Sequence, residues 1–161
     1  MIPKKIHYCW FGKGQMPKRE QRCIASWKKH MPKFELILWD ESNFDVNSIP
    51  FTKQAYEAKK YAFVSDYVRL HALSKDGGIY LDTDVEIIRP FEDFVKYEAF
   101  GSFETPHVVQ TGVIGSIPKG LLIQKMLDYY KGRSFFLKDG TFDQIPNTKI
   151  LTDILLNEGL V

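Results

Sequence analysis

The stretch GGIYLDTDVEII, residues 77–88, places two carboxylates inside an otherwise apolar run. Its opening glycine pair predicts the end of a helix and a turn of the chain. Residues 79–81 are typical of a buried strand, and we expect residues 85–88 to continue in extended form. Asp82 and Asp84 therefore interrupt a segment that otherwise builds core.

The spacing of the two aspartates predicts a metal site. Residues i and i+2 of an extended segment point to the same side, so Asp82 and Asp84 should face one way. Carboxylates that close repel each other unless a cation lies between them. Mg²⁺ and Mn²⁺ prefer oxygen ligands and can bind a diphosphate at the same time. The alternative is a solvated Asp-x-Asp turn, which strand-like segments on both sides disfavour.

Outward from this stretch, strand-like and helix-like segments alternate, which is typical of an α/β fold. We expect strands at 5–11, 34–39, 79–81, 99–103 and 108–114, and helices at 18–30, from 50 to about 75, from 116 to about 130, and at 148–157. Ligands of such sheets bind at the carboxyl ends of the strands, which here are residues 9–12 and 81–84.

The composition narrows the class of protein. Lys plus Arg is 22 and Asp plus Glu is 20, a balance that gives no reason to expect nucleic acid as a partner. The start of the chain lacks a signal peptide and no run approaches a membrane span, so we expect at most peripheral membrane association. Cys9 and Cys23 do not have metal-finger spacing and are expected to be reduced thiols of a cytosolic protein.

Asp66 and Arg69 stand out in the apolar helix that precedes the glycine pair. Their i, i+3 spacing puts them on one face of the helix. They can form a simple helix salt bridge, or they can lie beside the metal site, because the glycine turn returns the helix alongside the strand. In the second case Asp66 would accept hydrogen bonds from sugar hydroxyls, and Arg69 would hold a phosphate or orient the carboxylates.

The first predicted strand ends in two aromatic residues and a glycine. Trp10 at this end can stack on a nucleobase, and Gly12 allows close approach of a ligand to the backbone. The alternative is that Trp10 packs in the core. His7, inside the strand, is expected to be a hydrogen-bonded core histidine.

Four segments in order, IPKKIHYCWFG, AFVSDYVRLHAL, GGIYLDTDV and VVQTGVIGS, give the chain a family resemblance. It resembles the DXD-containing sugar transferases of glycosyltransferase family 32, which include yeast-type mannosyltransferases and bacterial capsule and polysaccharide enzymes. It is more distantly similar to the glucosylating domains of large clostridial toxins. The resemblance implies a GT-A type fold, with a mixed, mainly parallel central sheet flanked by helices.

The resemblance also implies an activity. It implies Mn²⁺ or Mg²⁺, a UDP- or GDP-sugar donor, and transfer with retention to a hydroxyl of a polysaccharide or glycolipid precursor. The expected location is the cytoplasm, either in solution or at the inner face of the membrane. We expect residues 1–161 to form a single domain that is cut short at its C-terminal end, since family members continue into a segment that closes the metal site.

Carried over to this chain, the resemblance assigns site residues. Asp82 and Asp84 match the catalytic motif that holds metal and donor, with Asp84 as the direct metal ligand and Asp82 toward the ribose or sugar. Asp66 and Arg69 match donor-binding positions. Trp10 matches the aromatic residue that stacks on the base.

Four further residues follow from the resemblance. Tyr80 and Gly78 match the frame of the motif, and Tyr80 is counted with the donor-binding residues. Gln110 stands where the family often has Asn, and an acceptor-side role is expected for Gln110 and Thr111.

Two rival interpretations remain open on the sequence. An aspartate-nucleophile phosphatase also runs an apolar strand into D-x-D, with Asp82 as the nucleophile. That class expects Thr or Val where this chain has Glu86. The other rival is a nucleotide-sugar-binding domain without catalysis.

Overall fold

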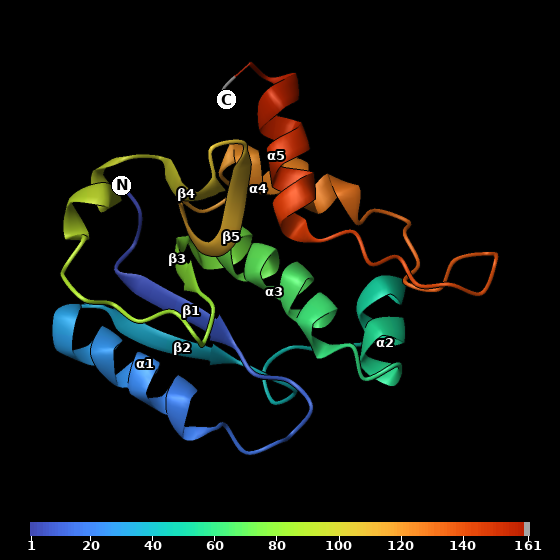
Figure 1. The fold of residues 1–161 in the computed structure, drawn as a ribbon, viewed down its shortest axis with the longest axis horizontal. Coiled ribbons are helices and arrows are strands. Elements are labelled where there is room, and N and C mark those ends of the chain that lie inside the picture. Colours follow the sequence, from blue (N-terminus) through green and yellow to red (C-terminus); the bar gives the residue numbers. More distant parts are fainter. Residues whose placement is uncertain (160–161) are drawn as a thin grey trace.

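The computed structural model describes residues 1–159, which form a mixed five-stranded sheet with helices on both faces (Figure 1). The strands are β1 (Lys5–Cys9), β2 (Glu35–Trp39), β3 (Gly78–Leu81), β4 (Ala99–Thr105) and β5 (Val108–Ser116). The helices are α1 (Lys18–His30), α2 (Pro50–Glu57), α3 (Tyr61–Asp76), α4 (Leu121–Tyr129) and α5 (Asn147–Asn157), with a 3₁₀ turn η1 (Glu92–Lys96).

The strand order is β2-β1-β3-β5-β4. β1 pairs in parallel with β2 and β3, whereas β5 pairs antiparallel with β3 and β4, so β5 alone opposes the direction of the other four described strands. The predicted mixed α/β sheet is confirmed. The helix expected from residue 116 begins later, at Leu121, because β5 extends to Ser116.

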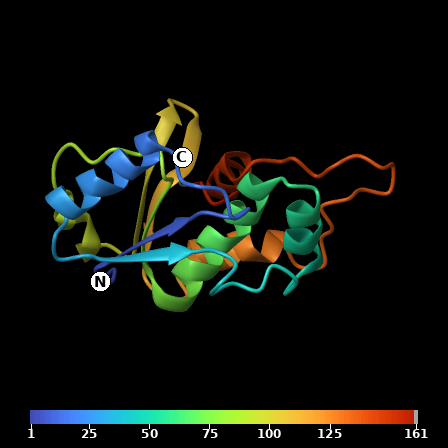
Figure 2. The same ribbon diagram turned by 90° about the horizontal axis from the view of Figure 1, so that it is seen from below.

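β3 is the strand that separates two hydrophobic cores. All four of its residues are buried, which explains its continuous apolar sequence. Ile79 and Leu81 pack with Trp27 of α1 on one face, while Tyr80 packs under α3 on the other. Figure 2 shows α1 and α3 on these opposite faces of the sheet.

The turn from α3 into β3 is built as the glycine pair predicts. Gly77 has φ +62°, and its N–H donates to the carbonyl of Leu73 at 2.9 Å. Gly78 has φ +115°, and an added Cβ would lie 2.8 Å from the Lys5 carbonyl. His7 is fully buried, with Nε2 2.8 Å from the Gly77 carbonyl, so the predicted core histidine is confirmed and helps to hold the turn.

Residues 85–88 do not continue β3 as a strand of the sheet. The Asp82 N–H still donates to the Gly112 carbonyl of β5, but the Val85 N–H donates back to the Asp82 carbonyl at 3.0 Å and closes a turn. The Trp27 indole then donates to the Val85 carbonyl at 2.7 Å. The segment therefore leaves the sheet and packs along α1.

Candidate active site

The sequence-predicted residues gather around two cavities at the carboxyl ends of β1 and β3. The first cavity, of about 590 Å³, is lined by Cys9, Trp10, Phe11, Gly12, Gly14, Glu20, Tyr61, Ala62, Ser65, Arg69, Tyr80, Asp82, Thr83 and Asp84. The second, of about 500 Å³, is lined by Asp66, Arg69, Asp82, Glu104, Gln110, Thr111, Gly112, Pro146, Asn147 and Thr148. Arg69 and Asp82 line both, so they form the wall between the two cavities.

Arg69 makes most of the polar contacts in this wall. Its Nη2 lies 2.9 Å from Oδ1 of Asp66 and 3.3 Å from Oδ1 of Asp82. Its Nη1 donates to the carbonyl of Thr111 at 2.9 Å and lies 3.2 Å from the Thr111 hydroxyl. One buried guanidinium thus joins α3, the end of β3, and β5.

Tyr80 contacts both residues of this wall. The guanidinium carbon of Arg69 lies 4.6 Å from the centre of the Tyr80 ring, and the phenol donates to Oδ1 of Asp82 at 3.1 Å. Burial raises the pKa of Tyr80 well above its ordinary value, so the phenol stays protonated and remains a donor. Tyr80 borders the first cavity but is only 2% exposed, which fits a residue that positions Asp82.

Burial and charge oppose each other in the Asp66–Arg69 pair. Burial raises the pKa of Asp66, and the nearby Arg69 only partly offsets this. Burial works against the charge of Arg69, but the carboxylates of Asp66 and Asp82 favour it, and the pKa of the guanidinium is raised. Arg69 therefore remains a cation, and Asp66 takes up a proton more readily than an ordinary aspartate.

Asp84 lies in a different environment. Its side chain is 55% exposed, and its Oδ2 lies 3.2 Å from Nη2 of Arg19 on α1. The prediction that extended geometry aligns Asp82 with Asp84 is wrong, because the chain turns between them. The turn nevertheless leaves both aspartates lining the first cavity.

Trp10 forms part of the wall of the first cavity and belongs to neither hydrophobic core. Its indole donates to the Gly14 carbonyl at 2.7 Å, which fixes the ring. Gly12 has φ +94°, and an added Cβ would lie 2.4 Å from the Tyr61 ring, so only glycine fits there. The arrangement leaves a half-buried aromatic ring beside the cavity.

Gln110 and Thr111, for which we expect an acceptor-side role, make different contacts. Thr111 is buried and holds Arg69. Gln110 lines the second cavity, and its amide donates to the Ser102 hydroxyl at 2.6 Å. Both residues line the second cavity.

Two residues at the site had no distinctive signal in the sequence. Glu20, in the first turn of α1, lines the first cavity, and its Oε2 is buried without a hydrogen-bond partner among residues 1–159. Acidic residues are common in first turns, so this one did not stand out. Asn147 is buried, donates to the Asp66 carbonyl at 2.7 Å and accepts from the Tyr130 hydroxyl at 2.6 Å.

The donor set of the first cavity fits a hard divalent cation. Asp82 and Asp84 offer carboxylate oxygens, and Glu20 adds a buried oxygen with no partner in the described part of the chain. Mg²⁺ and Mn²⁺ prefer such ligands. Within residues 1–159 no three His, Cys, Asp or Glu side chains are close enough together to hold a metal alone. The residues present therefore suit an ion that completes its coordination with ligand and water oxygens.

Part of the chain matches a protein-family model. The family model described as "Glycosyltransferase sugar-binding region containing DXD motif" matches residues 17–101. This range contains Asp66, Arg69, Asp82 and Asp84, and it excludes Trp10.

Several curated proteins are similar to the chain. Inositol phosphoceramide mannosyltransferase 3 of Schizosaccharomyces pombe is 32% identical over 118 residues, 71% of this chain and 33% of that protein. Mannosyl phosphorylinositol ceramide synthase CSH1 of Saccharomyces cerevisiae is 30% identical over 141 residues, which cover 81% of this chain and 36% of that protein. Subversion of eukaryotic traffic protein A of Legionella pneumophila is 29% identical over 132 residues, which cover 65% of this chain and 20% of that protein. The chain thus spans from a fifth to about a third of these relatives.

A solved structure shows the same fold. PaToxG Glycosyltransferase superimposes with a TM-score of 0.72 at 21% identity, covering 98% of this chain and 69% of that one. The predicted GT-A-like α/β fold is therefore confirmed. At this identity the likeness concerns the fold alone.

Proposed function

Because the chain belongs to the family of glycosyltransferase sugar-binding regions that contain a DXD motif, we propose that it transfers a sugar from a nucleotide-diphosphate sugar to a hydroxyl acceptor. The wall formed by Arg69 and Asp82 carries this proposal. A donor in the first cavity and an acceptor in the second would meet at that wall. Neither rival, the phosphatase nor the binding domain, requires two adjoining cavities.

The first cavity would bind the donor. Trp10 would stack on the base, as its fixed ring at the cavity wall allows. Asp84 and Asp82 would hold a Mn²⁺ or Mg²⁺ ion, which would supply Lewis-acid neutralisation of the departing diphosphate. The exposure of Asp84 supports this role, since a surface ion pair is easily exchanged.

The wall would bind the sugar that is transferred. Carboxylate oxygens accept hydrogen bonds from hydroxyl groups, and Asp66 and Asp82 keep free lone pairs beside their contacts to Arg69. Arg69 would orient both carboxylates before the donor arrives, so no reorganisation is needed during the reaction. Retention at the anomeric carbon follows from the family resemblance and forms part of the proposal.

The second cavity would bind the acceptor. Gln110, Glu104 and Thr148 give it amide, carboxylate and hydroxyl groups, which suit a polyhydroxylated molecule such as a glycan or a glycolipid headgroup. The fungal relatives carry names that refer to mannosyl transfer and inositol phosphoceramide. These names favour a glycolipid acceptor over a capsular polysaccharide.

The proposal is tested by donor binding and transfer. A panel of UDP- and GDP-sugars, with Mn²⁺ and with EDTA, is measured by calorimetry on the chain and on Asp84→Asn. We expect one donor to bind with Mn²⁺ only, and Asp84→Asn to weaken that binding about tenfold or more. Asp93→Asn, an exposed aspartate of η1 outside both cavities, is the matched control.

Transfer to a glycolipid acceptor is then followed with labelled donor, and the anomeric product is determined by NMR. Metal-dependent transfer that is unchanged in Asp84→Asn would contradict the proposal. A phosphoenzyme on Asp82 would support the phosphatase instead, and donor binding without transfer by the natural protein would support the binding domain.

A further inference from the structure

The small net charge of the chain conceals a concentration of cations. Residues 13–33 contain seven Lys and Arg but one Glu, whereas the rest of the chain contains 15 Lys and Arg and 19 Asp and Glu. The segment is thus strongly basic and the remainder is acidic. α1 lies within this segment.

α1 presents its cations on the side away from the sheet. Cys23 and Trp27 are buried against the core. Lys18, Arg22 and Lys29 lie within about 40° of one another around the helix axis and extend over about 16 Å along it. All three are exposed. We call these three residues the cationic stripe.

Nothing in the described structure neutralises the cationic stripe. Among residues 1–159 no carboxylate lies within 4.0 Å of its nitrogens, in contrast to Arg19, which pairs with Asp84. The only acidic residue of α1, Glu20, lines the first cavity. The exposed Lys28 extends the positive face.

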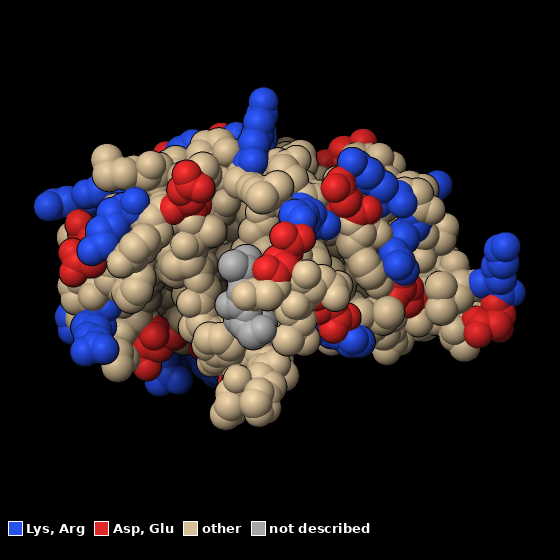
Figure 3. All heavy atoms as spheres, turned by 90° about the horizontal axis from the view of Figure 1, so that it is seen from above, with Lys and Arg blue, Asp and Glu red and all other residues tan. Residues whose placement is uncertain are grey.

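The face opposite α1 carries charges of both signs (Figure 3). Figures 1 and 2 place α1 on the outside of the sheet, remote from α4 and α5. The opposite side of the molecule, seen in Figure 3, intersperses Lys and Arg with Asp and Glu. On the α1 side Arg19 is paired with Asp84, whereas the three cations of the stripe have no carboxylate within 4.0 Å among residues 1–159.

We propose that the cationic stripe of α1 binds the anionic surface of a phospholipid membrane. A straight row of Lys and Arg on one helix face suits a flat array of phosphate and carboxylate headgroups. Ala25 is the apolar residue between them, and the stripe exposes no large apolar side chain that would insert into the bilayer. Binding would be electrostatic, reversible and sensitive to salt.

Nucleic acid fits this face less well. Proteins that bind single strands interleave cations with aromatic side chains on which bases stack, and the exposed positions of α1 carry no aromatic residue. The acidic remainder of the molecule would also repel a polyanion that extends beyond the stripe. A flat membrane surface can contact the cationic stripe without contacting the acidic remainder of the molecule.

The test is flotation of the chain with lipid vesicles. Vesicles of phosphatidylcholine with about 30% phosphatidylserine are compared with pure phosphatidylcholine, at about 0.1 M and about 0.5 M salt. The chain is expected to float with the anionic vesicles at low salt only. The triple variant K18E/R22E/K29E should lose about tenfold or more of this affinity.

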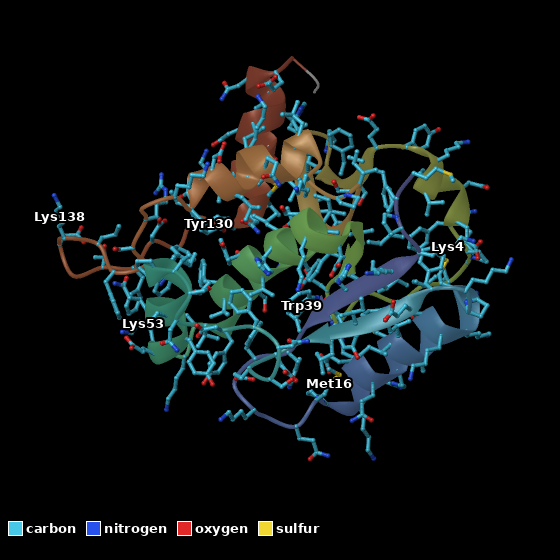
Figure 4. All side chains as sticks on the ribbon, turned by 180° about the vertical axis from the view of Figure 1, so that it is seen from behind. Lys4, Met16, Trp39, Lys53, Tyr130 and Lys138 are labelled. Atoms are coloured by element: carbon cyan, nitrogen blue, oxygen red, sulfur yellow. The ribbon has the colours of Figure 1, made fainter. Side chains whose placement is uncertain are left out.

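The matched control, K53E/K119E/K138E, changes the net charge equally at exposed lysines outside α1. Lys53 and Lys138 lie at the end of the molecule away from Met16 and α1 (Figure 4). The control should float like the parent chain, and both variants should keep its thermal midpoint.

Three results would overturn the proposal. They are no flotation of the parent chain with anionic vesicles, equal flotation with neutral vesicles, and equal loss in the stripe and control variants. Binding of the parent chain to RNA at the same salt, without vesicle binding, would assign the stripe to nucleic acid. None of these measurements depends on the transfer reaction.

Discussion

The two aspartates of the DXD motif are two residues apart and contact different arginines. Asp82, whose side chain is 38% exposed, contacts Arg69, whose side chain is 7% exposed, and also accepts a hydrogen bond from the Tyr80 hydroxyl. Asp84 contacts Arg19, whose side chain is 65% exposed. The protein thus fixes one carboxylate before any ligand binds and leaves the other free to change partners.

This difference indicates that Asp82 is held in position before a ligand binds, whereas Asp84 can exchange its contact to Arg19 for a contact to a ligand. Arg69 and Asp66 form a buried pair, and loss of one partner of such a pair leaves the other charge buried without compensation. An exposed pair contributes little and is screened by salt. We therefore expect substitutions around Asp82 to affect folding and those around Asp84 to affect ligand binding.

Arg69→Met should have the largest effect on stability. It leaves Asp66 and Asp82 facing each other without a cation, and loss of one partner of a buried pair costs about 3–5 kcal/mol. Urea unfolding of Arg69→Met and of the control Arg19→Met measures the difference. Equal losses in the two variants would show that the buried and exposed pairs do not differ.

Gly112→Ala tests how closely the carboxylate of Asp82 is confined. An added Cβ would lie 2.7 Å from Oδ2 of Asp82 and 2.9 Å from Oε1 of Gln110. Overpacking of this kind costs about 1–3 kcal/mol, and the displaced carboxylate should also bind the donor more weakly.

The matched control for that substitution is Gly101→Ala on β4. An added Cβ there meets only a Val109 methyl at 3.8 Å, which is ordinary contact. Both unfolding and donor binding of the control should resemble the parent chain. A Gly112→Ala variant with normal donor binding would show that Asp82 tolerates displacement.

The buried side should also respond to pH through Asp66. Burial raises the pKa of Asp66 above its ordinary value, so the folded state takes up this proton at a higher pH than the unfolded state does. The contribution of Asp66 to stability should therefore increase as pH falls from neutral through its raised pKa, and be lost as pH rises. Unfolding free energies of the parent chain and Asp66→Asn are compared from neutral pH downward. A parent chain that gains stability relative to Asp66→Asn as pH rises would contradict this sign.

The sequence predicts the surroundings of Asp82 well. Local signals end α3 at Gly77 and return the chain into β3, which brings Asp66 and Arg69 beside Asp82. These signals all lie within one stretch of the chain from α3 to the end of β3, so the strand and helix patterns place three of the charged groups.

Contacts between distant segments explain what the sequence does not predict. The turn after Asp82 depends on Gly112 of β5 and on the indole of Trp27, which takes Val85 away from the sheet. Asn147 holds the Asp66 carbonyl from 81 residues further along the chain. No local pattern encodes these partners.

Arg19→Ala should give the smallest effect and the sharpest test of the exposed side. Stability should change by less than about 1 kcal/mol, since an exposed pair contributes little. If Asp84 exchanges Arg19 for a cation, removal of Arg19 frees the carboxylate and Mn²⁺ should bind up to about fivefold more tightly without nucleotide. Arg22→Ala, one turn away and outside the first cavity, removes the same charge without freeing Asp84. Calorimetric titration with Mn²⁺ compares the two variants, and weaker binding in Arg19→Ala would show that Arg19 positions Asp84 instead of competing for it.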